Sequence, residues 1–229
     1  MAKWQDTGQG LMWLDQPQRV VGMRLGTRTS AVFLNEENAW VVISPGPDWA
    51  AELAPRLDLN KVHYLVAPNM YHHLHLTKAQ KMCPQAQCWL APGLAAKRVD
   101  IKADGVLTDQ SPWQDSGLST FIVNGMPGLN ELVFFHAPSK TLIMTDLVFN
   151  IRTSDHWWTR LAMRLNGSYA KFGPSKVMKG MVKEADSARA SFEQLLQQPF
   201  TRIIMAHGDV LEAEDAPQQL KQAFAWLWD

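Results

Sequence analysis

The sequence predicts one α/β domain over residues 1–229, and two facing β-sheets with helices on their outer faces would account for its pattern. Two observations predict this class. Short apolar runs separated by polar turns fill the first third of the chain, and helical and strand patterns then alternate. The same succession returns in the second half. Alternation by itself does not distinguish two facing sheets from a single doubly wound sheet.

The first half of the chain contains apolar runs bounded by turn residues, which predict strands. The expected strands are 19–25, 29–34, 39–44, 62–66 and 87–90. A helix is expected from Asp48, a suitable N-cap, to about Leu57. A second is expected from Leu76 to the residue before Pro84.

The second half repeats this pattern. The expected strands are 120–123, 131–135, 141–145 and 202–205, and the expected helices are 156–165, 186–197 and 216–228. The helix 186–197 has the clearest amphipathic pattern, with Phe192, Leu195 and Leu196 on its apolar side.

Charge and cysteine usage limit the kinds of partner. Lys and Arg total 22, as do Asp and Glu, so neither nucleic acid nor an anionic membrane is expected as a partner. No apolar run approaches the roughly 18 residues needed to span a bilayer, and the first residues lack a signal-peptide pattern. The spacing of Cys83 and Cys88 does not fit CxxC chemistry, and reduced thiols suit a cytoplasmic protein. The expected partner is a small-molecule substrate or ligand.

One segment departs from this balance. Residues 151–183 carry seven cations against Asp155 alone. A solvated basic face is the usual interpretation, and attraction of an acidic ligand is the alternative. Within the segment, residues 156–164 are both aromatic and basic. Such a helix suits a membrane interface or a lid, although burial of Trp157 and Trp158 against the core is the commoner outcome.

Polar side chains follow three of the expected strands. His72, His73 and His75 come after strand 62–66, Asp146 after strand 141–145, and His207 after strand 202–205. A rigid sheet aims side chains at strand ends into a shared cleft. Taken singly, these features also fit surface histidines, a helix cap and a turn. Together they favour a site of imidazole and carboxylate ligands, a set that suits zinc, iron or manganese.

Several segments resemble the metallo-β-lactamase superfamily. Residues 131–136 and 140–147 resemble its hairpin that ends on a metal-bridging Asp, 204–208 its final ligand strand, and 41–46 an early strand end. The order matches over about residues 20–211, and the resemblance implies a four-layer αββα sandwich. A closer resemblance, carried by residues 66–69, His72-His73 and 139–147, is to an uncharacterised branch of that superfamily, a domain of unknown function.

The sequence departs from the superfamily's metal motifs. If His72 and His73 take the last two positions of its His-x-His-x-Asp-His motif, Pro68 and Met70 take the places of its first two histidines. Pro68 has no donor atom and Met70 offers only a thioether. No histidine lies in residues 125–128, near the position of the superfamily's middle ligand, and Ser44 replaces a supporting Asp. The resemblance therefore implies that the three-histidine site is lost.

The second site of the superfamily is better preserved. The resemblance implies that His72, His73, Asp146 and His207 hold one divalent metal, zinc first and iron or manganese as alternatives. His75 takes the place of one of these histidine ligands if the motif is shifted by two residues. Glu131, the carboxylate nearest the missing middle histidine, either binds the metal or a water molecule or simply begins a strand.

Two functions follow from the resemblance. The first is a mononuclear metal-dependent hydrolase of an ester, thioester, lactone or phosphoester, with Glu131 and His75 as candidate catalytic residues. The alternative is a non-catalytic descendant of the fold, with no metal, whose cleft binds a small ligand or nothing. Geometry distinguishes them, because metal retention requires the ligands to converge within about 2–2.5 Å of one point.

Overall fold

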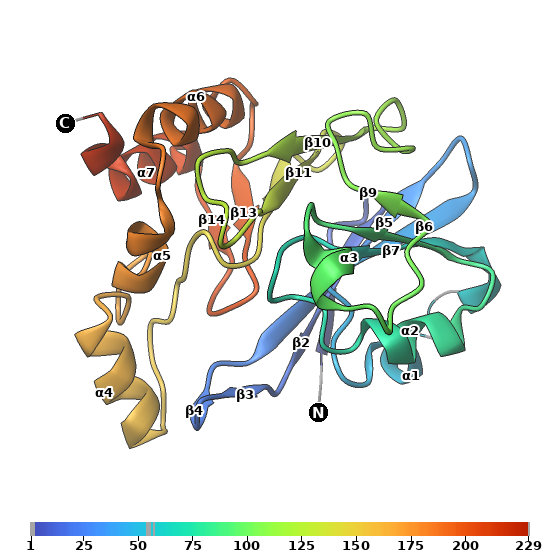
Figure 1. Ribbon diagram of the computed structural model, residues 1–229, viewed down its shortest axis with the longest axis horizontal. Coiled ribbons are helices and arrows are strands. Elements are labelled where there is room, and N and C mark those ends of the chain that lie inside the picture. The colour runs from blue at the N-terminus through green and yellow to red at the C-terminus, as the bar shows by residue number, and fades with distance from the viewer. Residues whose placement is uncertain (1–2, 54–55, 57, 229) are drawn as a thin grey trace.

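The computed structural model describes residues 3–53, 56 and 58–228 and contains two mixed β-sheets that face each other (Figure 1). The first sheet runs from antiparallel strands at one side to parallel strands at the other. Its order is β1 (Lys3–Asp6), β2 (Leu11–Gln16), β5 (Thr27–Leu34), β6 (Ala39–Ile43), β7 (Val62–Ala67), β8 (Gln87–Leu90) and β9 (Gly105–Val106).

The second sheet is antiparallel except between its third and fourth strands. Its order is β10 (Leu118–Ile122), β11 (Leu132–His136), β12 (Thr141–Ile143), β13 (Arg202–Ile204) and β14 (Leu211–Glu212). A separate hairpin pairs β3 (Arg19–Val20) with β4 (Met23–Arg24).

Helices flank both sheets. The α-helices are α1 (Trp49–Leu53), α2 (Leu76–Met82), α3 (Leu94–Lys97), α4 (Trp157–Leu165), α5 (Lys176–Met181), α6 (Ala185–Leu196) and α7 (Ala216–Ala223). Short 3-10 helices cover Leu59–Lys61 and Ala225–Leu227. Within the described part of the chain, no helix combines the length and apolarity needed to cross a bilayer.

The side-chain alternation of strands creates separate core layers. On β6, Val41 and Ile43 pack in the core between the two sheets, whereas Val42 packs in the outer core beneath α1 and α2. This division follows from the two-residue period of a strand. Because both faces of β6 are buried, the whole strand is apolar.

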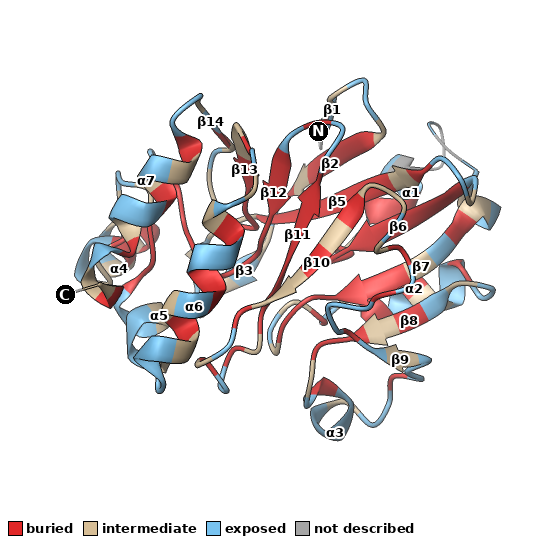
Figure 2. Ribbon diagram, turned by 90° about the horizontal axis from the view of Figure 1, so that it is seen from above, coloured by how far each residue is buried: buried red, intermediate tan, exposed pale blue. Residues whose placement is uncertain are grey.

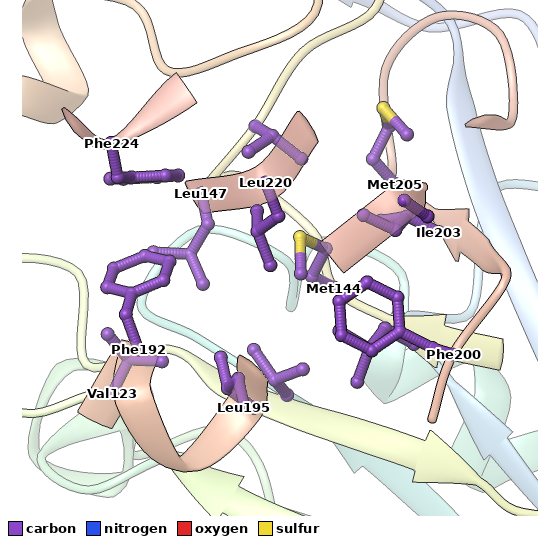
Figure 3. Close-up of a cluster of buried hydrophobic side chains, with 14 of the residues drawn as sticks. Val123, Met144, Leu147, Phe192, Leu195, Phe200, Ile203, Met205, Leu220 and Phe224 are labelled. Atoms are coloured by element: carbon purple, nitrogen blue, oxygen red, sulfur yellow. The ribbon is translucent and has the colours of Figure 1, made fainter. Parts of the chain in front are cut away.

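The second sheet divides its side chains in the same way. Helices α6 and α7 pack on its outer face around Phe192 and Phe224, whose ring centroids lie 4.0 Å apart (Figure 3). The outward faces of these helices are exposed (Figure 2). Helix, sheet, sheet and helix layers therefore follow one another, and the predicted αββα fold class is confirmed.

The structure corrects several expected elements. Residues 19–25 do not form one strand, because Val21 and Gly22 adopt positive φ angles of 48° and 77° and reverse the chain between β3 and β4. Strand β2 was not predicted, since it is buried on both faces and lacks alternation. The expected helix from Asp48 is the shorter α1, and its expected end at Leu57 lies outside the described residues. Helix α5 was also not predicted.

The topology gathers several chain segments at one edge of the sandwich. Strands β6 and β7 are parallel, as are β12 and β13, so each pair ends on a common side. The two sheets meet at this edge, where the Leu132 amide donates to the Pro68 carbonyl at 2.9 Å. The segments that follow β7, β12 and β13 carry the four predicted metal ligands, which are His72, His73, Asp146 and His207.

A buried histidine on the fold's second sheet makes stability depend on pH. Burial lowers the pKa of His136 to about 4, whereas the unfolded chain protonates it below about pH 6.5. The unfolded state therefore binds more protons between these values, and folding stability falls as the pH falls through that window. We expect His136 to account for a loss of about 1–2 kcal/mol between about pH 7 and about pH 5.

Urea unfolding at both pH values measures this loss. His136→Asn keeps a group that can donate to or accept from the Ser139 hydroxyl, and we expect it to reduce the difference between the two pH values. The matched control is His63→Asn, at an exposed position on β7. An unchanged pH dependence in His136→Asn would show that other groups cause it.

Candidate metal centre

Three polar side chains converge where the two sheets meet. His72 Nε2 lies 3.4 Å from Asp146 Oδ2, and His207 Nε2 lies 3.4 Å from Asp146 Oδ1. One ligand atom from each residue lies within 4.8 Å of the others. All three side chains are at least nine-tenths buried, so the site is shielded from bulk water on most sides.

Hydrogen bonds at the opposite ring nitrogens orient both histidines. His207 Nδ1 lies 2.8 Å from the Gly26 carbonyl, which can only accept, so Nδ1 carries the proton. In the neutral ring this leaves a lone pair on Nε2, which faces Asp146. His72 Nδ1 lies 2.7 Å from Ser44 Oγ, and donation to that hydroxyl leaves its Nε2 equally free. Metal-binding histidines typically have such a partner at their second nitrogen.

The distances fit a shared cation. Two ligand atoms about 2.0–2.2 Å from one tetrahedral ion stand roughly 3.4 Å apart, which matches the distance from each histidine Nε2 to the Asp146 oxygen that it faces, Oδ2 for His72 and Oδ1 for His207. Two imidazoles and a carboxylate suit zinc, iron or manganese. Three protein ligands also leave a coordination position open, as in catalytic zinc sites rather than structural ones.

The charges of the three residues depend on one another. Burial opposes ionisation of Asp146, but His72 and His207 together hold the pKa of this carboxyl below its usual range. Burial alone would lower the pKa of His72, but the charge and hydrogen bond of Asp146 outweigh it and raise that pKa. Asp146 is therefore an anion that requires a nearby positive charge, either a proton on His72 or a cation.

The amide of Asn69 connects the loops that carry His72 and Asp146. Its Nδ2 lies 2.8 Å from Asp146 Oδ2 and 3.0 Å from Glu131 Oε2. Its Oδ1 accepts from the backbone amides of Tyr71 and His72. Asn69 is fully buried, and no role was predicted for it beyond its place in the family resemblance, because its partners lie far along the chain. A polar residue two positions after the apolar strand β7 is the local signal that could have identified it.

Glu131 has a positioning role in this geometry. Its Oε1 accepts from the Thr145 amide at 2.6 Å, and its Oε2 accepts from the Asp146 amide at 2.8 Å. Burial and the charge of Asp146 raise the pKa of this carboxyl. Because these backbone amides donate to its two oxygens, Glu131 fixes the backbone of Thr145 and Asp146.

Arg28 and Gly208 hold the segment that carries His207. The buried Arg28 guanidinium on β5 donates to the carbonyls of Met205 and Gly208. Gly208 has a φ of 97°, and a Cβ placed there would lie 2.4 Å from the carbonyl carbon and oxygen of Asn150. A side chain at this position would force the two segments apart. Arg28 was not predicted as part of the site, because Met205 and Gly208 lie 177 and 180 positions further along the chain.

The other predicted site residues lie outside the group of three. His73 points to Arg98, with 2.5 Å between its Nδ1 and Nη1 of the guanidinium, and burial followed by the Arg98 charge lowers its pKa. His75 lies in the wall of the adjoining cleft, with Nε2 3.4 Å from Gln18 Oε1. Burial, followed by the charge of Lys78, lowers the pKa of His75. Met70 packs against the outer core of the first sheet.

A cleft of about 660 Å³ opens from the three residues. Its walls are mostly apolar and come from the β3–β4 hairpin, residues 71–75, α4 and α5. The apolar lining includes Val20, Val21, Met23, Leu25, Phe149, Met163, Val177, Met178 and Met181. Among the described residues, Asp146 is the only acid and Lys97 the only Lys or Arg in the lining. The cleft therefore offers a polar end at the candidate metal centre and a long apolar remainder.

The fold and the His–Asp–His group define a protein of the metallo-β-lactamase fold with a possible metal site. The family model described as "Domain of unknown function (DUF4336)" matches residues 9–164. The chain belongs to this family.

Solved structures share the fold at low sequence identity. A metallo-β-lactamase from Pontibacter korlensis has a TM-score of 0.68 at 12% identity, with 100% of each chain covered. The Flv1 flavodiiron core from Synechocystis sp. PCC6803 has a TM-score of 0.69 at 12% identity, covering 99% of this chain and 61% of its own. A metallo-β-lactamase from Hirschia baltica has a TM-score of 0.63 at 12% identity, with coverage of 99% and 97%. No curated protein matches the chain by sequence.

Glu131→Gln tests the positioning role of this carboxylate. The new amide directs an N–H group toward a backbone donor, so at least one buried donor loses its acceptor. We expect the free energy of unfolding to fall by about 2–3 kcal/mol in urea titrations. Glu36→Gln, at an exposed position, is the control and should change it little. Equal stability of both variants would refute the role.

Gly208→Ala tests whether the close approach to Asn150 holds His207 in place. The added methyl group meets backbone atoms at a positive φ angle, so the loop must shift. We expect a destabilisation of about 2–4 kcal/mol, together with weaker zinc binding measured by competition with a chelating dye. The control is Gly128→Ala, where no atom lies within 4 Å of the new Cβ. Equal zinc affinity in the two variants would contradict the expectation.

Proposed function

We propose that this chain is a mononuclear metal-dependent hydrolase whose cation is held by His72, Asp146 and His207. The main support is that these three side chains converge with an open side toward the cleft. Zinc is the first candidate, and iron or manganese also suit the ligand set. The proposed substrates are an ester, thioester, lactone or phosphoester.

The chain's own residues prepare the site for this reaction. A bound divalent cation supplies Lewis acidity, which lowers the pKa of a water molecule and polarises a carbonyl or phosphoryl oxygen. Gly26 and Ser44 fix the two imidazole rings, and Asn69 and Glu131 fix Asp146. His75 is the proposed proton carrier, because its ring lines the cleft and its lowered pKa favours the neutral form that accepts a proton.

The cleft lining favours a substrate with an apolar part. Four methionines line it, and their flexible side chains adapt to hydrocarbon groups of varied shape. Lys97, whose Nζ lies 5.0 Å from the Tyr71 ring centroid, supplies a cation among the lining residues. An acyl ester or thioester combines a hydrolysable carbonyl with such a tail.

A second candidate function is binding of a small ligand without catalysis. Pro68 and Met70 stand at two ligand positions of the three-histidine site, and Met70 packs into the core. In this alternative a proton on His72 neutralises Asp146, in agreement with the raised pKa of that imidazole. Metal content separates the two functions.

Metal analysis is the first test. The chain purified without added zinc and then reconstituted should bind about one equivalent of zinc. His72→Gln and His207→Gln should weaken binding at least about tenfold, because even partners outside the ligand shell typically contribute about 10–100-fold. His73→Gln is the matched control, since the ring beside Arg98 lies outside the group. Uptake of less than about a tenth of an equivalent by the unsubstituted chain would refute metal binding.

Hydrolysis of an acyl thioester series by the zinc-loaded chain tests the substrate class. We expect kcat/KM to rise up to about fourfold for each methylene that enters the apolar part of the cleft. Met178→Gln should reduce this dependence, and Met82→Gln, outside the cleft, should not. Stoichiometric zinc binding without hydrolysis of any member of the series would contradict this substrate class.

A further inference from the structure

Helix α4 presents an apolar stripe to solvent. Trp157, Leu161 and Leu165 are spaced four residues apart and therefore lie on one side of the helix. They are 63%, 42% and 65% exposed. Burial of Trp157 against the core, the commoner outcome for such a sequence, is not observed. Thr159 and Met163 occupy the buried side instead.

The β3–β4 hairpin extends this stripe. Trp158 Nε1 donates to the Val21 carbonyl at 3.1 Å, and the Arg24 amide donates to Thr159 Oγ1 at 2.8 Å. The hairpin and α4 thus lie side by side at one end of the molecule (Figure 1). Val21 at the hairpin turn is 84% exposed. We call Val21, Trp157, Leu161, Leu165 and the charged residues of these two elements the α4–hairpin face.

Cations dominate the charged residues of this face. Arg19 and Arg24 are exposed on the hairpin, and Arg160 and Arg164 lie on α4. Asp155 precedes the helix and faces Arg24 at 3.8 Å. Lys176 lies beside the C-terminal end of α4, where its amide donates to the Asn166 carbonyl. The chain is neutral as a whole, so this local excess of positive charge is a property of the face.

We propose that the α4–hairpin face binds the surface of an anionic lipid membrane. A short helix with Trp and Leu on one side and Arg beside them lies in the interface between headgroups and acyl chains. Exposed cations then attract the anionic headgroups. A second copy of this chain fits less well, because a two-fold contact through this face would bring the arginines of both copies together.

The position of the face suits this role. Met163, on the buried side of α4, lines the cleft, so the same helix has one side toward the cleft and the other toward solvent. Val21 and Val177, which also line the cleft, are 84% and 55% exposed. Membrane binding at this face would place an opening of an apolar cleft close to lipid. The inference does not require a metal or catalysis.

Vesicle flotation with the full chain tests the proposal. We expect binding to vesicles of equal parts phosphatidylcholine and phosphatidylglycerol, and much weaker binding to phosphatidylcholine alone. High salt should reduce binding, because it screens the cations. Equal binding to both vesicle types, or none to either, would overturn the proposal.

Two sets of variants locate the contact. The triple variant Trp157→Ser, Leu161→Ser, Leu165→Ser should lower the partition coefficient about tenfold or more. The control is the double variant Val99→Ser, Val106→Ser, at exposed apolar positions elsewhere. Arg164→Gln and Arg19→Gln should each lower partitioning about fivefold, the change that corresponds to about 1 kcal/mol per cation. Lys81→Gln and Lys102→Gln are the charge controls.

Thermal unfolding checks that the variants fold, and sedimentation velocity measures their oligomeric state. The substituted side chains are exposed, so we expect all variants to keep the melting temperature of the unsubstituted chain within a few degrees. If the unsubstituted chain is a dimer that the triple variant converts to a monomer, with no vesicle binding by either, the face joins two copies and the proposal fails. Equal flotation of the triple variant and the unsubstituted chain would also overturn it.

Discussion

The hydrogen bonds of the Asn69 amide join the two sheets at the edge where the candidate ligands meet. On one side the amide holds the backbone of His72, and on the other it contacts the carboxylates of Glu131 and Asp146. A buried polar network of this kind is stable only when its groups are satisfied, because each unpaired donor or acceptor costs about 1–3 kcal/mol. The loops after β7 and β12 therefore cannot shift independently, and His72 and Asp146 keep a fixed separation.

Two buried carboxylates close to each other place a further constraint on the site. The charge of Asp146 raises the pKa of Glu131, while the two histidines lower the pKa of Asp146. Backbone amides stabilise Glu131, but Asp146 depends on positive charge from its neighbours. A divalent cation among His72, Asp146 and His207 would supply that charge, as would a proton on His72. The same electrostatic requirement thus underlies both candidate functions.

The family resemblance implied the fold class, and the polar residues after three apolar strands include His72, Asp146 and His207, which the structure brings together. Asp146 and His207 each lie three residues after the end of an apolar strand, β12 and β13 respectively. The parallel pairing of these strands brings both residues to one edge of the sheet. The separation of His72 from His73 could not be predicted, because the partner of His73 is Arg98, 25 residues further along the chain. The hydrogen bonds of Asn69 could not be predicted for the same reason, since its partners Glu131 and Asp146 lie 62 and 77 positions away. Local patterns also failed at β2, where burial on both faces removes the alternation that marks a strand.

The central claim is that His72, Asp146 and His207 form one metal site with an open position. The electronic absorption spectrum of the cobalt(II)-substituted chain tests this most directly, because the intensity of the visible bands reports the coordination number. We predict the intense bands of four-coordinate cobalt at one equivalent, and their loss in Asp146→Asn but not in His73→Gln. A weak spectrum identical to that of hydrated cobalt, unchanged by Asp146→Asn, would contradict the claim.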